Sequence, residues 1–463
     1  MKNSTNEKNE STASRKILNN YRLYAYDCDN NKFVEKKGVY ASAFPVVIKC
    51  DGTVWDKAAL YLNALAIQRK SSKLLKTVGD DLLDFLRFME THNIDMLHIP
   101  IEKELRVTYR YRQDLLNREK LGRNTAAQRI ARIVAFYEYC FDNNLFTKEE
   151  LKNRLPKKLK DSLFVKRKEK RWRKNSQGFG FQIEYEVSDL SIPRTPSAEQ
   201  STDAIKDGRQ LHPLSEEEQE VFHKYLKKHT SRLFQLICII ALCTGARLQA
   251  VCTLRVEDIK TMKDGRTEKG AFKALKVGGK TSTVDNKQDK PYNIFFPIWL
   301  VEELAEYINS EDWKERAAKS YYKNNNNYVF LSKHGNALYT SRLENEDREN
   351  NKYPVEPHDS GVERSGEAVR KYLNDIRVLM KENNEPIRKF SFHDLRATFG
   401  LNLLRYLESN SELPLEEILE EIRERMGHSS RIITESYINY HARNKAYERV
   451  SEQYMKSIYR YDN

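Results

Sequence analysis

Two arginines and a histidine stand at positions where a folded chain could use them together. Arg247 follows Thr244 and Gly245, where one predicted helix ends and the next begins, and the free N–H groups at a helix start attract anions. His393 and Arg396 lie three residues apart in SFHDLR, so on a helix they share one face. A planar guanidinium matches the oxygens of a phosphate, and the imidazole adds a second donor. These residue types therefore indicate a site for a phosphate group.

A histidine and a tyrosine nine positions apart follow near the C-terminus. The segment MGHSSRIITESYINY predicts a helix that ends at Met426 and Gly427, a turn with His428, and a second helix with Tyr437. A tyrosine hydroxyl can act as a nucleophile and form a covalent intermediate. Tyr440 lies about one helical turn further on and is the reserve nucleophile. Each motif alone is equally well explained by a surface arginine, a helix cap or two helices joined by a turn.

Taken in order, the motifs resemble those of the tyrosine recombinase (lambda integrase) family. The series is TGAR, a lysine in a hairpin loop, HDLR, MGH, and a tyrosine nine residues after that histidine. The resemblance covers residues 213 to 450, and the helical region at 53 to 150 corresponds in place and type to the family's core-binding domain. It implies the following catalytic residues: Arg247, Lys280, His393, Arg396, His428 and Tyr437.

Two features depart from the family pattern. The family commonly has an acidic residue three positions after its first arginine, whereas this chain has Ala250 there, so the support for Arg247 has to come from elsewhere. The loop GGKTSTVDNKQDKP is longer than the family's usual hairpin, and Lys287 or Lys290 could therefore take the role of Lys280.

The resemblance implies a reaction that cuts and rejoins DNA without ATP. The arginines and His428 clamp the phosphodiester oxygens, Tyr437 attacks to give a 3′ phosphotyrosine while His393 helps to take its proton, and a loop lysine protonates the leaving 5′ hydroxyl. No cofactor and no metal are expected. The six cysteines form no C-x-x-C pair and no Cys/His cluster with zinc spacing, which favours buried thiols.

The charge of the chain points to a polyanion as partner. The net charge is +13, and twelve Lys or Arg residues stand against two acidic residues between Lys152 and Lys174, with Trp172 among them. Such a run suits the regularly spaced phosphates of double-stranded DNA, although a solvated charged linker would look the same. No stretch has the length of apolar residues that a membrane span needs, and the N-terminus lacks the apolar region of a secretory signal. We expect a cytoplasmic, nucleoid-associated protein without membrane contact.

The chain is predicted to be mainly α-helical, with a small antiparallel β-sheet in the catalytic domain, and to form a two-domain DNA clamp. A capping box at Thr125 and Gln128 predicts one helix start, and strands are predicted at 259–262, 271–277 and 292–296. The expected boundaries are a disordered tail at 1–18, an N-terminal arm or small β element at 19–52, a helical core-binding domain at 53–150, a basic interdomain linker at 151–210, and a catalytic domain with a helical tail at 211–463.

The leading hypothesis is a site-specific DNA recombinase, an integrase or transposase of a mobile genetic element. It would act as a homotetramer on paired recombination sites, with accessory DNA-bending or directionality proteins as further partners. Its C-terminal segment at 441–459 is expected to be a helix that docks on a neighbouring subunit or on its own domain. Two alternatives stay open: a type IB topoisomerase, and a catalytically silent DNA-binding regulator of the same fold.

Overall fold

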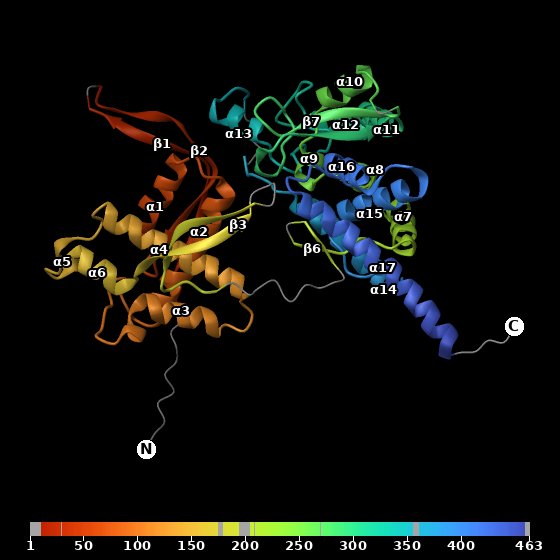
Figure 1. Ribbon diagram of the computed structural model, residues 1–463. Coiled ribbons are helices and arrows are strands. Elements are labelled where there is room, and N and C mark those ends of the chain that lie inside the picture. Colours follow the sequence, from red (N-terminus) through yellow and green to blue (C-terminus); the bar gives the residue numbers. More distant parts are fainter. Residues whose placement is uncertain are drawn as a thin grey trace. The chain divides into compact units, whose positions relative to one another are not determined.

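The computed structural model describes residues 11–28, 30–174, 179–193, 204–207, 209–268, 270–354 and 361–458. The chain divides into two compact units (Figure 1). The first comprises residues 1–175, 180–200 and 360–363, and the second comprises residues 176–179, 201–359 and 364–463. The prediction of a mainly helical chain with small antiparallel sheets is confirmed.

A long antiparallel hairpin opens the first unit. Its strands are β1 (Ser14–Asp27) and β2 (Lys32–Ile48), paired from Ser14 opposite Ile48 to Asp27 opposite Lys32 with a register shift between Arg22 and Tyr24. The expectation of a disordered tail at 1–18 is therefore wrong for residues 14–18, and residues 1–10 lie outside the described residues. The sequence is polar there, but β1 pairs along most of its length with β2, whose Ala41, Phe44 and Val47 are buried.

Helices build the rest of the first unit. They are α1 (Asp56–Ile67), α2 (Ser72–Thr91), the 3₁₀ turn η1 (Lys103–Leu105), α3 (Val107–Asn117), α4 (Arg123–Asp142), α5 (Lys148–Leu151) and α6 (Pro156–Leu163). Apolar side chains of α2 and α4 meet in one core, with Phe85, Ile133 and Tyr137 fully buried. The start of α4 differs from the prediction: Gly122 is the N-cap, and no side chain caps the helix.

The segment predicted as a basic linker at 151–210 is folded where it is described. It contains α6 and a two-stranded antiparallel hairpin, β3 (Lys166–Lys174) and β4 (Gly180–Ser188). Leu159, Leu163, Leu190 and Ile192 are buried in the core of the first unit. The high density of charge obscured the helix, because Leu159 and Leu163 stand among the basic residues and Leu190 and Ile192 lie beyond them.

The second unit is helical around a small sheet. Its helices are α7 (Glu216–His229), α8 (Arg232–Thr244), α9 (Leu248–Cys252), α10 (Val256–Asp264), α11 (Ile298–Asn309), α12 (Glu311–Ala317), α13 (Arg342–Glu349), α14 (Glu367–Glu382), α15 (Phe392–Asn410), α16 (Leu415–Met426) and α17 (Arg431–Ile458). The strand pairs are β5 (Ile205–Lys206) with β6 (Gln210–Leu211), and β7 (Phe272–Val277) with β8 (Tyr292–Pro297).

The strands predicted at 271–277 and 292–296 are present as β7 and β8, but residues 259–262 belong to helix α10. The short apolar run there was ambiguous. Val256, Ile259 and Met262 are buried at intervals of three, which is the spacing of one helical face. The predicted helix at 431–440 and the tail at 441–459 are one continuous helix, α17, as far as Ile458 (Figure 1).

Among the helices in the part of the chain that the structure describes, none combines the length and the apolar character that crossing a membrane requires.

Candidate active site

Arg247 stands at a sharp junction between two helices. Helix α8 ends at Gly245, which has φ +67°, and Arg247 is the N-cap of α9. A side chain at Gly245 would strain this left-handed backbone, and its Cβ would lie 2.6 Å from the ring of Phe399. The glycine thus lets the chain reverse within a packed environment. The guanidinium of Arg247 is directed to Asn286, with 3.4 Å between Nη1 and Oδ1.

Arg396 joins three separate parts of the second unit. It lies on α15, and its side chain is fully buried. One terminal nitrogen donates to the carbonyl of Gly245 and the other to the carbonyl of Met426. Its Nε donates to Oδ2 of Asp207 at 3.1 Å. The two carbonyls belong to the turns after α8 and α16, so Arg396 holds both turns, and the residues that follow them, around one point.

A carboxylate occupies that point. Asp207 lies in the turn between β5 and β6 and is 6% exposed. Its Oδ2 is 3.7 Å from Nε2 of His393 and 3.6 Å from Nε2 of His428, while its Oδ1 is 3.9 Å from Arg247. Four of the six predicted catalytic side chains therefore surround a single anionic group. The motifs that bring them there are separated by as many as 181 positions along the chain.

The electrostatics of this cluster are strongly shifted. Burial alone would raise the pKa of Asp207, but His428, Arg396 and His393 outweigh burial and hold it far below the usual range. Burial lowers the pKa of both His393 and His428 to about 4, so both imidazoles are neutral near pH 7. Burial and the neighbouring Arg396 lower the pKa of Arg247. The cluster therefore has more positive charge than its surroundings favour, and an anion stabilises it.

Tyr437 lies next to the cluster on α17 and is completely buried. Its ring centroid is 5.6 Å from that of His428, which in turn is held by Thr434 at 3.0 Å. Burial raises the pKa of Tyr437, with opposing electrostatic contributions from Arg396 and Asp207. Gly400 makes the space for this ring, because a Cβ there would lie 2.6 Å from Cε1 of Tyr437. The reserve candidate Tyr440 is buried in the same apolar cluster of α15, α16 and α17.

The loop lysines are less closely associated with the cluster. Lys280 is exposed in the turn after β7, and Lys287 is exposed at the start of η2 (Lys287–Asp289). Lys290 lines a hollow that His428, Gly427 and Tyr292 also line. Of the three lysines considered, Lys290 is thus the one placed in a hollow together with a residue of the cluster.

The acid missing at position 250 has a structural explanation. Ala250 is fully buried in the main core of the second unit, where an unpaired carboxylate would be costly. Asp207 and Asn286 face Arg247 in its place, and the amide of Asn286 donates to the carbonyl of Lys290 at 2.8 Å. Neither residue was predicted from the sequence. Asp207 lies in a polar segment that was interpreted as a linker. The apolar residues Ile205 and Leu211 on either side of it were the only indication that this segment is packed against the rest of the unit.

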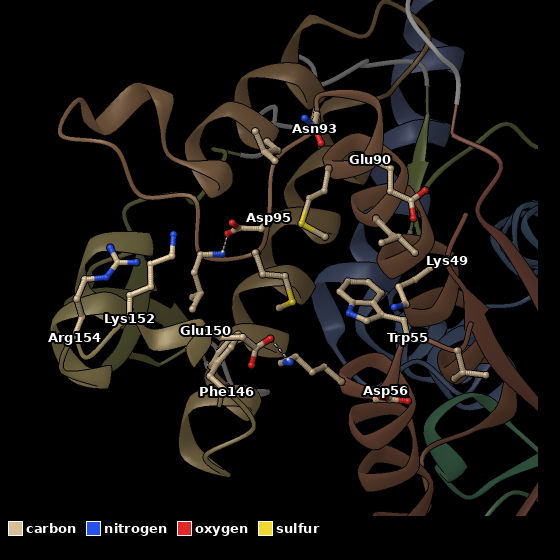
Figure 2. Close-up of a pocket in the computed structure, with 17 residues that line it drawn as sticks. Lys49, Trp55, Asp56, Glu90, Asn93, Asp95, Phe146, Glu150, Lys152 and Arg154 are labelled. Carbon is tan, nitrogen blue, oxygen red and sulfur yellow. Dashed lines mark hydrogen bonds and ion pairs between the residues drawn. The ribbon is translucent and has the colours of Figure 1, made fainter. Parts of the chain in front are cut away.

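Arginines also gather around a buried carboxylate in the first unit, where Arg129 and Arg132 contact Asp81 at 3.0 and 2.5 Å. Within the described ranges, no group of three or more His, Cys, Asp or Glu side chains is arranged to hold a metal ion. The first unit contains a hollow of about 620 Å³ lined by Trp55, Glu90, Phe146 and Glu150 (Figure 2). Its charged groups are of both signs, and Lys57 pairs with Glu150 at 2.8 Å. This hollow has no convergence of like charges on one point.

Comparisons with known proteins concern the fold. No family model matches the sequence, and no curated protein matches it. The chain is similar to the XerH site-specific recombinase bound to its difH substrate, with 13% identity, 84% of each chain covered and a TM-score of 0.44. It is also similar to a lambda integrase dimer bound to a COC′ core site (11% identity, 82% of this chain and 94% of that one, TM-score 0.42) and to the Tn1549 transposon integrase with transposon right end DNA (12%, 85% and 99%, TM-score 0.41).

Proposed function

We propose that this chain is a tyrosine recombinase that cuts and rejoins double-stranded DNA through a 3′ phosphotyrosine. The observation that carries the proposal is the convergence of Arg247, Arg396, His393 and His428 on one anion, Asp207, beside the buried Tyr437. Two arginines and two histidines around one point are suited to a phosphodiester, which has two non-bridging oxygens and gains charge during cleavage. The proposal is that the scissile phosphate binds where the carboxylate lies.

Each step of the proposed reaction has a group assigned to it. The hydroxyl of Tyr437 attacks phosphorus, the bond to the 5′ oxygen breaks, and the tyrosine becomes esterified to the 3′ phosphate. His393 takes the tyrosine proton; its pKa of about 4 leaves it neutral near pH 7 and so able to accept one, and the negative charge of a bound phosphate would raise this pKa toward the working range. The guanidinium groups of Arg247 and Arg396 stabilise the charge that builds up on the equatorial oxygens. The reverse attack by a 5′ hydroxyl of another strand releases the tyrosine and completes strand transfer.

A loop lysine supplies the proton for the leaving 5′ hydroxyl. Lys280 is the residue implied by the family resemblance, whereas the hollow shared with His428 favours Lys290. A 5′-thio-substituted substrate separates them, because a thiolate leaves without needing a proton. The variant of the acting lysine, Lys280→Ala or Lys290→Ala, loses cleavage of the ordinary substrate and recovers it on the thio substrate, while the other variant behaves like wild type on both.

The wider context follows from the same chemistry. Strand exchange needs two sites and four cleavages, so we propose a homotetramer on paired sites, as an integrase or transposase of a mobile element with accessory DNA-bending partners. The two units would each contact the duplex, and the basic segment from Lys152 to Lys174 would track the phosphate backbone. DNA affinity should then fall by about 10³-fold or more between 50 and 200 mM salt, the range for six to ten phosphate contacts.

The test is a denaturing gel of the protein with labelled, nicked duplex from its own genomic junction. Wild type is expected to form a covalent adduct that Tyr437→Phe abolishes and Tyr440→Phe retains. Loss of the adduct only in Tyr440→Phe would show that Tyr440, and not Tyr437, is the nucleophile. A junction that is bound but never cleaved by any variant would favour a silent DNA-binding regulator, and relaxation of plasmids without the junction would favour a topoisomerase.

A further inference from the structure

Asp207 resembles a bound phosphate in its negative charge and in the way that its two carboxylate oxygens contact different cationic side chains. Oδ1 faces Arg247 at 3.9 Å, and Oδ2 faces Arg396 at 3.1 Å together with the two histidines. The two non-bridging oxygens of a phosphodiester would be divided between the two arginines in the same way. A carboxylate and a phosphate cannot both occupy this position, because each has a negative charge and needs the same donors.

The carboxylate does not fill the site. Only Arg396 reaches it at hydrogen-bond distance, while Arg247 and both histidines lie at 3.6 to 3.9 Å from its oxygens. Nε2 of His428 and the hydroxyl of Tyr437 are buried and have no hydrogen-bond partner among the described residues. Buried polar atoms without partners are uncommon in proteins; others lie elsewhere among the described residues, and these two belong to the cluster around Asp207. A phosphate group, whose oxygens extend further from its centre, is the ligand that would reach these atoms.

The turn that positions Asp207 is attached to the helix of the nucleophile. The backbone N–H of Lys206 donates to Oγ of Ser436 at 3.3 Å, and Ser436 directly precedes Tyr437 on α17. Ile205 and Leu211 on either side of the turn are buried in the cluster that contains Tyr437. The strands of this hairpin have only two residues each. The turn can therefore open while its two apolar anchors remain in place.

We propose that Asp207 occupies the phosphate site in the DNA-free protein as an internal competitor, and that DNA has to displace it before Tyr437 can react. This inference rests on the proposed function for the identity of the ligand. The exchange of one anion for another keeps the two arginines compensated at all times. It also links access to the site with α17, because opening of the turn breaks the hydrogen bond between Lys206 and Ser436.

Anion binding tests the competitor without any need for DNA cleavage. Inorganic phosphate and sulfate are titrated into wild type, Asp207→Asn and Asp312→Asn at constant ionic strength, with thermal stabilisation as the readout. Asp312 is exposed on α12 and paired with Arg316, so its variant changes the net charge equally at a distant place. Removing a competing charge is expected to tighten anion binding by about tenfold in Asp207→Asn alone. Equal or weaker binding in Asp207→Asn than in wild type overturns the proposal.

Adduct formation provides the second arm. If Asp207 competes, Asp207→Asn forms the phosphotyrosine adduct at least as fast as wild type. If Asp207 is instead a permanent support for the arginines, the folded variant loses the adduct, and the proposal is wrong. If Asp207→Asn binds anions more tightly but no protein, wild type included, forms an adduct, the competitor role of Asp207 is supported and the proposed recombinase function is refuted.

A reversible lock keeps the test informative if Asp207→Asn does not fold. The lock is a disulfide between Lys206→Cys and Ser436→Cys, at the two residues that a backbone-to-side-chain hydrogen bond of 3.3 Å joins. The oxidised Lys206→Cys, Ser436→Cys protein should form no adduct, and reduction should restore it. An oxidised protein that reacts at the wild-type rate would show that the turn does not need to open.

A different observation carries a second inference, about the hairpin of β3 and β4. Its register places Arg167 and Arg171 on the same face as Phe181, Ile183 and Tyr185. Phe181 is 44% exposed and Tyr185 is 37% exposed, so aromatic surface lies beside cationic side chains. Each face also contains an acidic residue that pairs with one of its cations: Arg167 is 3.0 Å from Glu169 on this face, and Lys170 is 3.5 Å from Glu184 on the opposite face. Arg171 forms no ion pair among the described residues and is the cation of this face that the test below removes.

We infer that the arginine face of this hairpin enters a groove of duplex DNA. A two-stranded ribbon fits the major groove, and in the described residues no third strand pairs with either edge. Arginines reach phosphates or guanines, while apolar and aromatic side chains contact base edges. A protein partner is less favoured, because the charge of the segment is strongly positive.

Matched variants of the two faces test this placement. Arg171→Ala changes the proposed DNA face, and Lys170→Ala changes the other face. The two residues are neighbours in the sequence, and each variant removes one positive charge. Arg171→Ala should weaken binding of a duplex junction by about tenfold, against about threefold or less for Lys170→Ala. Equal effects of the two variants would indicate a general charge effect and refute the groove placement. The assay uses binding alone, so it stands even if no cleavage is found.

Discussion

The replacement Arg396→Lys tests whether one side chain organises the candidate site. Arg396 donates through three nitrogens to two backbone carbonyls and to Asp207, and it is fully buried. A lysine ammonium at the end of a flexible chain can retain at most one of these contacts in the same geometry. Two charge-assisted hydrogen bonds are then lost, each contributing about 1.5–3 kcal/mol, which gives a loss of about 3–6 kcal/mol in the free energy of unfolding.

This loss is large compared with the total stability of a domain, which is about 5–15 kcal/mol. At about 2–4 °C per kcal/mol for a unit of this size, it corresponds to a fall of about 6–24 °C in the melting temperature. The measurement is calorimetry or circular dichroism of the full chain. Arg405→Lys is the matched control, since Arg405 lies on the same helix and makes only an exposed pair with Glu216 at 3.3 Å. That change should alter stability by about 0.5 kcal/mol or less.

The same variant separates folding from chemistry when it is assayed well below its melting temperature. Removing a donor that stabilises developing charge lowers reaction rates by about 10²–10³-fold. Adduct formation by Arg396→Lys should fall by that factor, whereas Arg405→Lys should stay within about twofold of wild type. A melting temperature within about 2 °C of wild type would refute the role of Arg396 in joining the two turns. Adduct formation within a few-fold of wild type would refute its role in catalysis.

Three further outcomes are expected. His393 and His428 have pKa values of about 4 in the folded protein against 6.5 when unfolded, so each contributes stability above pH 6.5 that is lost as the pH falls toward 4. The loss is about 3 kcal/mol for each histidine, and urea unfolding of His428→Gln between pH 4 and 7 should show a smaller decline than wild type. Gly400→Ala places a methyl group against Tyr437, so it should slow adduct formation more than it changes DNA affinity, a split that single-turnover kinetics and binding assays would reveal. Adduct formation should be unaffected by EDTA, because arginine and histidine side chains supply the positive charge in the proposed mechanism, and its loss on chelation would contradict that mechanism.

Much of the local structure could be predicted from the sequence alone. Gly245 and Gly427 marked the helix ends that the structure has. The strands of the small sheet were placed within a residue or two, because their apolar residues lie between clear turn signals. These features depend on neighbours in the chain, and so they can be read from it. Residues 259–262 were misread because a run of four residues fits a strand and a helical face equally well.

The contacts that hold the candidate site together could be found only from the tertiary structure. The family resemblance supplied the four cationic and imidazole side chains, but nothing in the pattern linked them to Asp207 or Asn286. Asp207 precedes Arg396 by 189 positions and lies in a segment whose composition is that of a linker. Its role arises because burial makes a cluster of like charges unfavourable unless an anion is present. Which carboxylate or phosphate provides that anion depends on packing across the whole unit, so it cannot be predicted from the residues next to the site in the sequence.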